Sequence, residues 1–267
     1  MFAVILVFIL GALLTFACNS LAHIGVGWSV FWGVTAMLIM QVLIALFIRK
    51  KVMALTLRIQ DIISEGSKRI NRKIMSSQQK LAGNVKMMQK LVEKDQKEII
   101  SQAIEVVDTM DKYCKWNFLL KKQLDTMRMQ FYFQIGEYSK VDQFIPKAMY
   151  MEPVSVAIKM VRQYKNNSPE LDVTFKKKIR KFKGDKGIIL YALYSWILVQ
   201  KNEIDAAIKV LNMAKDQTDN ETIHQNLNHL QNGKIKKFSN AAIGEEWYAL
   251  KLEEPKYQIK QNTRRGF

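Results

Sequence analysis

The chain has 267 residues, a formal net charge of +17, and only 12 glycines and 4 prolines. Its two cysteines form no CxxC pair, which argues against a zinc site or a dithiol redox centre. Few glycines and prolines let helices run long, so the composition predicts an all-α protein of one or two modest domains. The basic surface favours anionic lipid, nucleic acid or an acidic protein face as a partner.

Two uncharged apolar runs occupy the first 48 residues and predict a transmembrane hairpin, with helices at about 2–18 and 26–48. A helix needs about 20 apolar residues to cross the hydrocarbon core, a length that the second run exceeds and the first approaches. Trp28 and Trp32 lie near the start of the second run, where aromatic side chains gather at a membrane interface.

The charges that follow the second run predict its orientation. Arg49, Lys50 and Lys51 come directly after it, whereas the loop between the runs has no lysine or arginine. The positive-inside rule then places the rest of the chain in the cytoplasm, so we expect a multi-pass protein of the inner (cytoplasmic) membrane. Two alternatives stay open, namely cleavage of the first run as a signal peptide and lipidation at Cys18.

Residues 49–111 predict a long basic amphipathic helix that connects the membrane segment to a domain. No proline interrupts this stretch, and Gly66 and "SSQQ" are the expected points of a break. A self-associating coiled coil, which would make homo-oligomers, is the alternative. The apolar stripe consists of Ile59, Ile63, Ile70, Ile74, Leu81, Val85, Met88 and Val92. The bases predicted to contact anionic lipid are Arg49, Lys50, Lys51 and Arg58.

The stretch QFYFQIGEYSKVDQFIPKAMYMEP places small residues, aromatics and a proline at particular offsets. Gly136 follows a helical segment, Tyr138 and Val141 come next, and Ala148 precedes Pro153. This arrangement resembles the second half of a tetratricopeptide repeat, in which small residues let two paired helices approach closely. The resemblance implies a helix before Gly136, a turn there, and a new helix that begins at Pro153.

A second copy of the motif lies further along, in ILYALYSWILVQKNEIDAAIKVLNMA. Ser195, Ala207 and Ala214 occupy the three small positions of the repeat. Asn202 stands where the first copy has its turn glycine, and Ile204 replaces the turn tyrosine. The resemblance therefore implies a second helix pair, and repeats of this family stack on one another into an α-solenoid.

The first copy departs from the family at two positions. Val141 is larger than the usual alanine, and Pro146 is expected to kink the second helix or to shift its start. The region between the copies, 154–186, predicts less regular helices, and "ETIHQNLNHLQNG" predicts a capping helix. A membrane hairpin followed by such repeats is also similar in layout to the bacterial HemY family.

The domain plan that follows has a hairpin at 1–48, a connector at 49–111, a tetratricopeptide-like helical domain at 112–250 and a basic tail at 251–267. In the tail, "EEWYALKLEEP" carries aromatics that are expected to dock on the last helix, and the residues after Pro255 are expected to be disordered.

No sequence motif points to catalysis, a cofactor or a metal. His224 and His229 are five residues apart and face different sides of a helix, and no nucleotide-binding or nucleophile motif occurs. The densest charge run, 176–186, predicts a solvated basic face that contacts an acidic protein, lipid or, least favoured, nucleic acid. Its leading bases are Lys176, Lys177, Lys178 and Arg180, and Phe175 and Phe182 suit the buried side of the same helix.

In tetratricopeptide proteins the first helices of successive repeats line a groove that holds a partner. The positions that the resemblance carries over are Asp125, Arg128, Tyr132, Tyr191, Tyr194 and Lys201. Two bases and several tyrosines would suit a peptide with acidic groups. We therefore expect a non-catalytic scaffold or adaptor that holds a protein partner at the membrane. The alternatives are a tethered binder of anionic lipid or nucleic acid, and a structural subunit of a transport or envelope-assembly complex.

Overall fold

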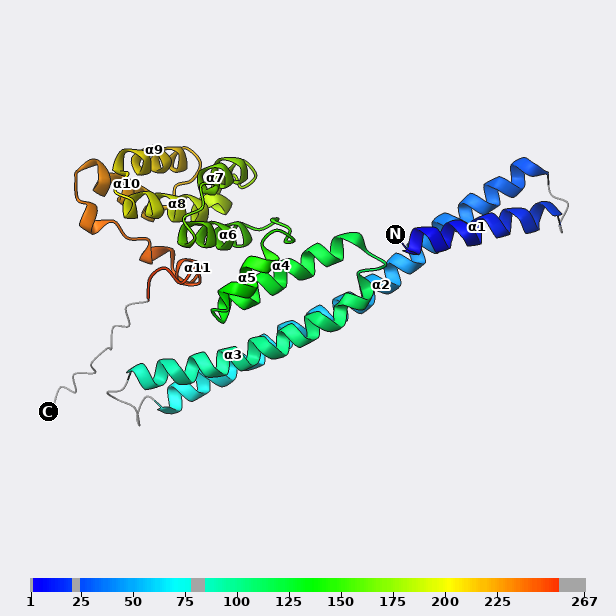
Figure 1. Cartoon of the computed structure of the whole chain (residues 1–267), viewed down its shortest axis with the longest axis horizontal. Helices are drawn as coiled ribbons and strands as arrows, with labels where there is room; N and C mark the ends of the chain where they lie inside the picture. The colour runs from blue at the N-terminus through cyan, green and yellow to red at the C-terminus, as the bar shows by residue number, and fades with distance from the viewer. Residues whose placement is uncertain (1, 21–24, 78–84, 255–267) are drawn as a thin grey trace. The chain divides into compact units, whose positions relative to one another are not determined.

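The computed structural model describes residues 2–20, 25–77 and 85–254. In these ranges all regular structure is helical, which confirms the all-α fold class (Figure 1). The chain divides into two compact units, Met1–Met149 and Tyr150–Phe267. The domain boundary expected near residue 112 therefore lies inside the first unit, and each unit is described by itself.

The first unit is built on one very long helix. After α1 (Phe2–Ser20), α2 (Val26–Ser77) runs unbroken for 52 residues. The predicted helix end near residue 48 is wrong, and so is the predicted break at Gly66. Lysine and arginine are good helix formers, so the basic residues after the apolar run extend the helix rather than end it. Among the described residues, α2 is the helix long and apolar enough to cross a membrane.

Small residues let α1 pack closely against the first part of α2 (Figure 1). A side chain added at Gly11 would overlap Met37, and one added at Gly33 would overlap the hydroxyl of Thr15. The Thr15 hydroxyl donates a hydrogen bond to the Gly11 carbonyl at 2.9 Å, so its polar group is satisfied inside an apolar helix. Gly11 and Gly33 are therefore points of close contact between α1 and α2.

The connector does not lead away from the anchor as a single helix. Instead, α3 (Val85–Thr109) lies antiparallel beside the second part of α2 (Figure 1). Lys73 pairs with Asp95 at 2.6 Å, and two turns away on α2 Gly66 lies directly against Ile99. Gly66 is therefore a point of close helix contact. The "SSQQ" break lies partly outside the described residues.

An apolar cluster joins α2, α3 and the helices that follow. These are η1 (Met110–Tyr113) and α4 (Phe118–Gln134), and the side chain of Asn117 caps α4 by accepting from two backbone N–H groups. The first members of the predicted stripe, Ile59 and Ile63 on α2, thus face apolar side chains of α3 and α4 in the same unit. The buried members of the cluster are Ile59, Ile100, Ala103, Ile104, Val106, Val107, Met110, Leu120, Leu124 and Phe131.

The first predicted repeat forms a helix pair, but its second helix is short. After α4 the chain turns at Gly136, whose φ of 77° suits glycine, and α5 (Tyr138–Phe144) packs back with Val141 fully buried. Pro146 follows the end of α5, since proline cannot continue a helical hydrogen-bond ladder. Ala148 therefore lies beyond the helix, and its expected role as a second close-packing position is wrong.

The second unit consists of short helices around α8. Its elements are α6 (Pro153–Lys165), α7 (Leu171–Ile179), η2 (Gly184–Gly187), α8 (Ile188–Gln200), α9 (Ile204–Lys215), α10 (Glu221–Gln231), η3 (Ile235–Lys237), η4 (Ala241–Ile243) and α11 (Glu245–Tyr248). Pro153 opens α6, as predicted, and Ser195, Ala207 and Ala214 are fully buried where α8 and α9 pack. Ten consecutive residues of α8, Ile189–Leu198, are buried.

Polar groups fasten the C-terminal segment onto α8. Trp247 packs edge-on against Trp196 with ring centroids 6.0 Å apart, and the Glu253 carboxylate accepts from both indole N–H groups at 2.7 and 2.9 Å. The buried Asn240 amide donates to the Ala192 carbonyl at 3.0 Å and accepts from Asn226 at 2.8 Å. The aromatic tail segment thus docks, as expected, but on α8 rather than on α10. Residues 255–267 lie outside the described part of the chain.

One helix ending occurs four times in the described residues. The helices α4, α6, α8 and α10 are each followed by a residue with positive φ, at Gly136, Asn167, Asn202 and Gly233. Successive members of this series are 31, 35 and 31 positions apart. Each ending has the same pair of backbone bonds, as in Asn202 N–H to Val199 O and Glu203 N–H to Leu198 O. The region 154–186 therefore contributes a helix pair with the same local turn.

Candidate functional site

The first part of α2 exposes an apolar surface in the described structure. Trp28, Leu38 and Phe47 are exposed by 65%, 64% and 61%. From Val26 to Phe47 the helix rises about 33 Å, close to the thickness of a bilayer core. An uncharged patch of this size on a soluble monomer is rare, so the surface is suited to lipid or to other apolar helices.

Basic residues encircle α2 where the apolar surface ends. Arg49, Lys50 and Lys51 are exposed, and consecutive residues of a helix point about 100° apart, so their charges spread around the axis. The Lys51 ammonium lies 5.7 Å from the centroid of the Phe47 ring, and Arg58 is exposed two turns further on. The four bases predicted to contact lipid are thus available to solvent on one continuous helix.

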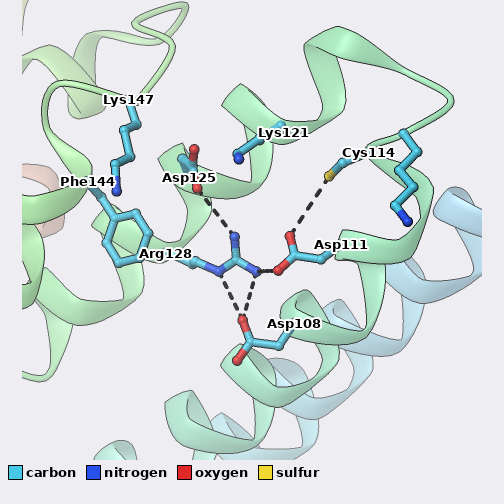
Figure 2. Close-up of a pocket in the computed structure, with 9 residues that line it drawn as sticks. Asp108, Asp111, Cys114, Lys121, Asp125, Arg128, Phe144 and Lys147 are labelled. Carbon is cyan, nitrogen blue, oxygen red and sulfur yellow. Dashed lines mark hydrogen bonds and ion pairs between the residues drawn. The ribbon is translucent and has the colours of Figure 1, made fainter. Parts of the chain in front are cut away.

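Two of the predicted groove residues form a buried ion cluster in the first unit (Figure 2). The Arg128 guanidinium donates to Asp108 at 2.8 and 3.0 Å, to Asp111 at 2.7 Å and to Asp125 at 3.3 Å. The Arg128 and Asp125 side chains are 8% and 6% exposed, whereas those of Asp108 and Asp111 are more than half exposed. These four hydrogen bonds reach carboxylates on three elements, so Arg128 ties the end of α3 and η1 to α4.

The positive charge of Arg128 is paired with carboxylates of the same chain. Burial acts to lower the pKa of Arg128, but hydrogen bonds and attraction from Asp111 and Asp108 outweigh it and raise that pKa. Beside the cluster is an open depression of about 740 Å³, lined also by Lys115, Lys121, Phe144 and Lys147. Because Arg128 already has its partners, an incoming acidic peptide would have to displace carboxylates of the chain itself.

The neighbouring groups of the depression are also engaged. Tyr132, the third groove residue of this unit, stacks on Phe144 with ring centroids 5.8 Å apart. The Lys140 ammonium lies 4.8 Å from the Tyr132 ring centroid. The Cys114 thiol donates weakly to Asp111 at 3.9 Å, and burial together with the Asp111 charge raises the pKa of Cys114.

The groove residues predicted in the second unit are mostly interior. Tyr194 stacks on Phe175 of α7 at 4.0 Å and Tyr191 meets the same ring edge-on at 5.9 Å, with both tyrosines more than nine-tenths buried. Burial raises the pKa of Tyr194, with a smaller contribution from a hydrogen bond to Asp172. The expectation that these rings line an open groove is wrong, because the α7 helix covers them. Lys201 is exposed.

The charge run of the second unit lies on α7 and the turn after it. Lys176, Lys177 and Arg180 are exposed, while Lys178 is half-buried with its ammonium 4.8 Å from the Tyr150 ring centroid. The phenylalanines at 175 and 182 are buried, as the sequence allowed. The four bases are therefore a surface of one short helix, backed by an apolar interior.

The sequence analysis did not identify Asp108 and Asp111 as partners of Arg128. Asp108 and Asp111 lie three residues apart on one helical face, as do Asp125 and Arg128, and that pairing is the signal which could have linked them. Glu253, which joins two tryptophans, had no local signal. In the described ranges no three His, Cys, Asp or Glu side chains are placed to hold a metal ion.

The described fold belongs to the class of all-helical proteins with one candidate membrane-spanning helix near the N-terminus. Comparisons with protein-family models, with curated proteins and with solved structures give no match.

Proposed function

We propose that this protein is a non-catalytic adaptor, anchored in the inner membrane by α1 and α2, that holds a protein partner at the cytoplasmic face. The observation that carries the proposal is the continuity of α2. Its first part exposes an apolar surface of membrane length, and its second part is the backbone of the folded core with α3. One helix therefore joins the anchor to the folded core of the first unit without a flexible linker.

The close packing of α1 on α2 supports a two-helix anchor. The contacts at Gly11 and Gly33 bring two uncharged helices together, and small residues at such positions are typical of helix pairs in lipid. The ring of bases at residues 49–51 then sits at the headgroup level on the cytoplasmic side. The exposed outer faces of both helices would contact acyl chains.

The recurring helix endings support a tetratricopeptide-like partner-binding domain. Helix pairs whose turns repeat every 31 to 35 residues are the building blocks of helical-repeat scaffolds, which act by presenting surface to other proteins. Since Tyr191 and Tyr194 are interior, the contact surface consists of the exposed helix faces. Lys201 belongs to that surface.

The test is capture of partners from mild detergent by the full-length chain and by the second unit alone, from Tyr150 onward. A fragment that begins near Lys112 would be a poor choice, because it would cut the apolar cluster between α3 and α4. Capture of the same soluble protein by both forms would support the adaptor. Capture of membrane proteins by the full chain alone would favour a structural subunit of a membrane complex, and no reproducible partner would refute both.

A further inference from the structure

The outer face of α7 carries a group of exposed bases. The exposed residues Val173, Lys176, Lys177 and Arg180 recur at helical spacing and form one face, which we call the α7 face. The opposite side, with Leu171, Thr174, Phe175 and Ile179, is buried in the second unit. The direction of the α7 face is thus set by core packing.

The bases of this face make no ion pair within the part of the chain that the structure describes. Asp172, the acid on the same helix, is engaged with Tyr194 at the helix start. Crowding of like charge is visible at Lys178, where burial, Lys181, Lys159 and Lys177 lower the pKa of the ammonium group. The positive field around α7 is therefore available to an external anion.

Exposed apolar and aromatic groups accompany the bases. Val173 and Met151 are exposed by 65% and 71%. The half-buried Tyr150 ring lies between the ammonium groups of Lys178 at 4.8 Å and Lys159 at 5.4 Å. Lysine, tyrosine and exposed aliphatic side chains together are typical of surfaces that lie in a lipid headgroup layer. A single-stranded nucleic acid would need stacking rings, but Phe175 and Phe182 point into the core.

We propose that the α7 face docks the second unit onto an anionic lipid surface. This inference rests on the proposed membrane anchor, which keeps the second unit within reach of the leaflet and raises its effective concentration there. The chain would then touch the bilayer twice, through α1 and α2 inserted in it and through α7 lying on it.

The test uses the full-length protein with Cys18 and Cys114 replaced by serine and Val173→Cys labelled with an environment-sensitive fluorophore. It is reconstituted into vesicles of phosphatidylcholine alone or with phosphatidylglycerol, both containing a nitroxide-headgroup lipid as quencher. The charge-reversal variant is Lys176→Glu, Lys177→Glu and Arg180→Glu. The matched control, with the same change in net charge, is Lys209→Glu, Lys215→Glu and Lys236→Glu, all exposed positions of the second unit. A label at Met213→Cys on α9 reports on a different helix.

We expect quenching of the label at position 173 on phosphatidylglycerol vesicles, reversal by high salt, and little quenching on phosphatidylcholine. Each base near an anionic leaflet changes the docking equilibrium by about fivefold, so the α7 variant should weaken docking by about a hundredfold or more. The matched control variant should retain docking, and the label at position 213 should stay unquenched.

Three outcomes would overturn the docking proposal while leaving the anchor intact. They are a wild-type label that stays unquenched on anionic vesicles, quenching that is equal on both lipids, and equal loss in the α7 variant and its matched control. Retention of the protein after an alkaline wash is measured in parallel. Extraction by that wash would refute the proposed anchor itself, so the two failures are distinguishable.

Discussion

Two apolar helices of this chain, α2 and α8, meet opposite surroundings. In α8 the residues Leu190, Leu193 and Ile197 are fully buried by the helices of the second unit. In the first part of α2, side chains of the same type such as Leu38 are mostly exposed. Similar composition therefore leads to a protein core in one case and to an uncovered surface in the other, and length separates them. A 13-residue helix cannot span a bilayer, whereas a 52-residue helix can do so and continue beyond it.

The sharpest way to break this comparison is to truncate one leucine in each helix. Leu193→Ala removes a fully buried side chain and should lower the free energy of unfolding of the second unit by about 3–4 kcal/mol. Leu38→Ala should change the free energy of unfolding of the first unit by less than about 0.5 kcal/mol, because the Leu38 side chain is mostly exposed. Denaturant titration of the full chain in detergent, with hydrogen exchange followed in α8 and in α2, measures both. Equal effects would show that the α2 surface is covered by protein.

The first unit contains a buried ion cluster around Arg128, whereas buried polar groups of the second unit, such as Asn240, form hydrogen bonds. Substitutions in the cluster measure how much it stabilises the first unit. Arg128→Met leaves Asp125 buried without its cation and should destabilise the α3–α4 junction by about 3 kcal/mol. Asp108→Asn, at a side chain that is more than half exposed, should cost less than about 1 kcal/mol. Hydrogen exchange at the end of α3 and in α4 measures both effects. An unchanged junction in Arg128→Met would mean that the apolar cluster alone holds these helices.

The α2–α3 contact can be opened at one position. Gly66→Leu places a side chain on Ile99 and should destabilise the pair by about 2 kcal/mol. The adjacent Ser67→Leu, on an exposed position, should have little effect. Faster amide exchange in α3 would report the separation. If Ile99→Ala fails to restore protection in the Gly66→Leu background, the contact is not the cause.

The smallest expected effect concerns the thiol beside the ion cluster. Burial and the Asp111 charge raise the pKa of Cys114, so at pH 8 less of it is thiolate and alkylation should be slower than that of a free cysteine. Asp111→Asn removes one of these causes and should speed the reaction. Peptide-level mass spectrometry after iodoacetamide treatment measures the rate. A slower reaction in Asp111→Asn would contradict this account.

Local chemistry in the sequence predicted the helix pairs well. The turns at Gly136 and Asn202, the helix start at Pro153 and the buried small residues of α9 all follow from backbone and steric rules that act within a few residues. The same rules failed where one sequence feature is compatible with two different structures. A glycine in an apolar stripe suits a break or a close contact, and at Gly66 only the position of Ile99, 33 residues later, decides between them.

The candidate sites were less predictable, because they depend on which helices cover one another. Tyr191 and Tyr194 are interior only because Phe175 of α7 packs on them, and Arg128 finds its partners on α3 and η1. The exposed bases at residues 49–51 and on α7 could be predicted, since long charged side chains stay in contact with water unless they are paired. The function proposed for them rests on the anchor.

The unbroken α2 also couples the tilt of its apolar part to the position of its C-terminal end. The part from Val52 to Ser77 is about 39 Å long, and a helix without a hinge transmits a change of tilt to its far end. Transmembrane helices are tilted on average by about 20° and tilt further in a thinner bilayer, and a change of that size would move the far end of α2 sideways by about 13 Å. Bilayer thickness would thus be converted into the lateral position of the C-terminal end of α2.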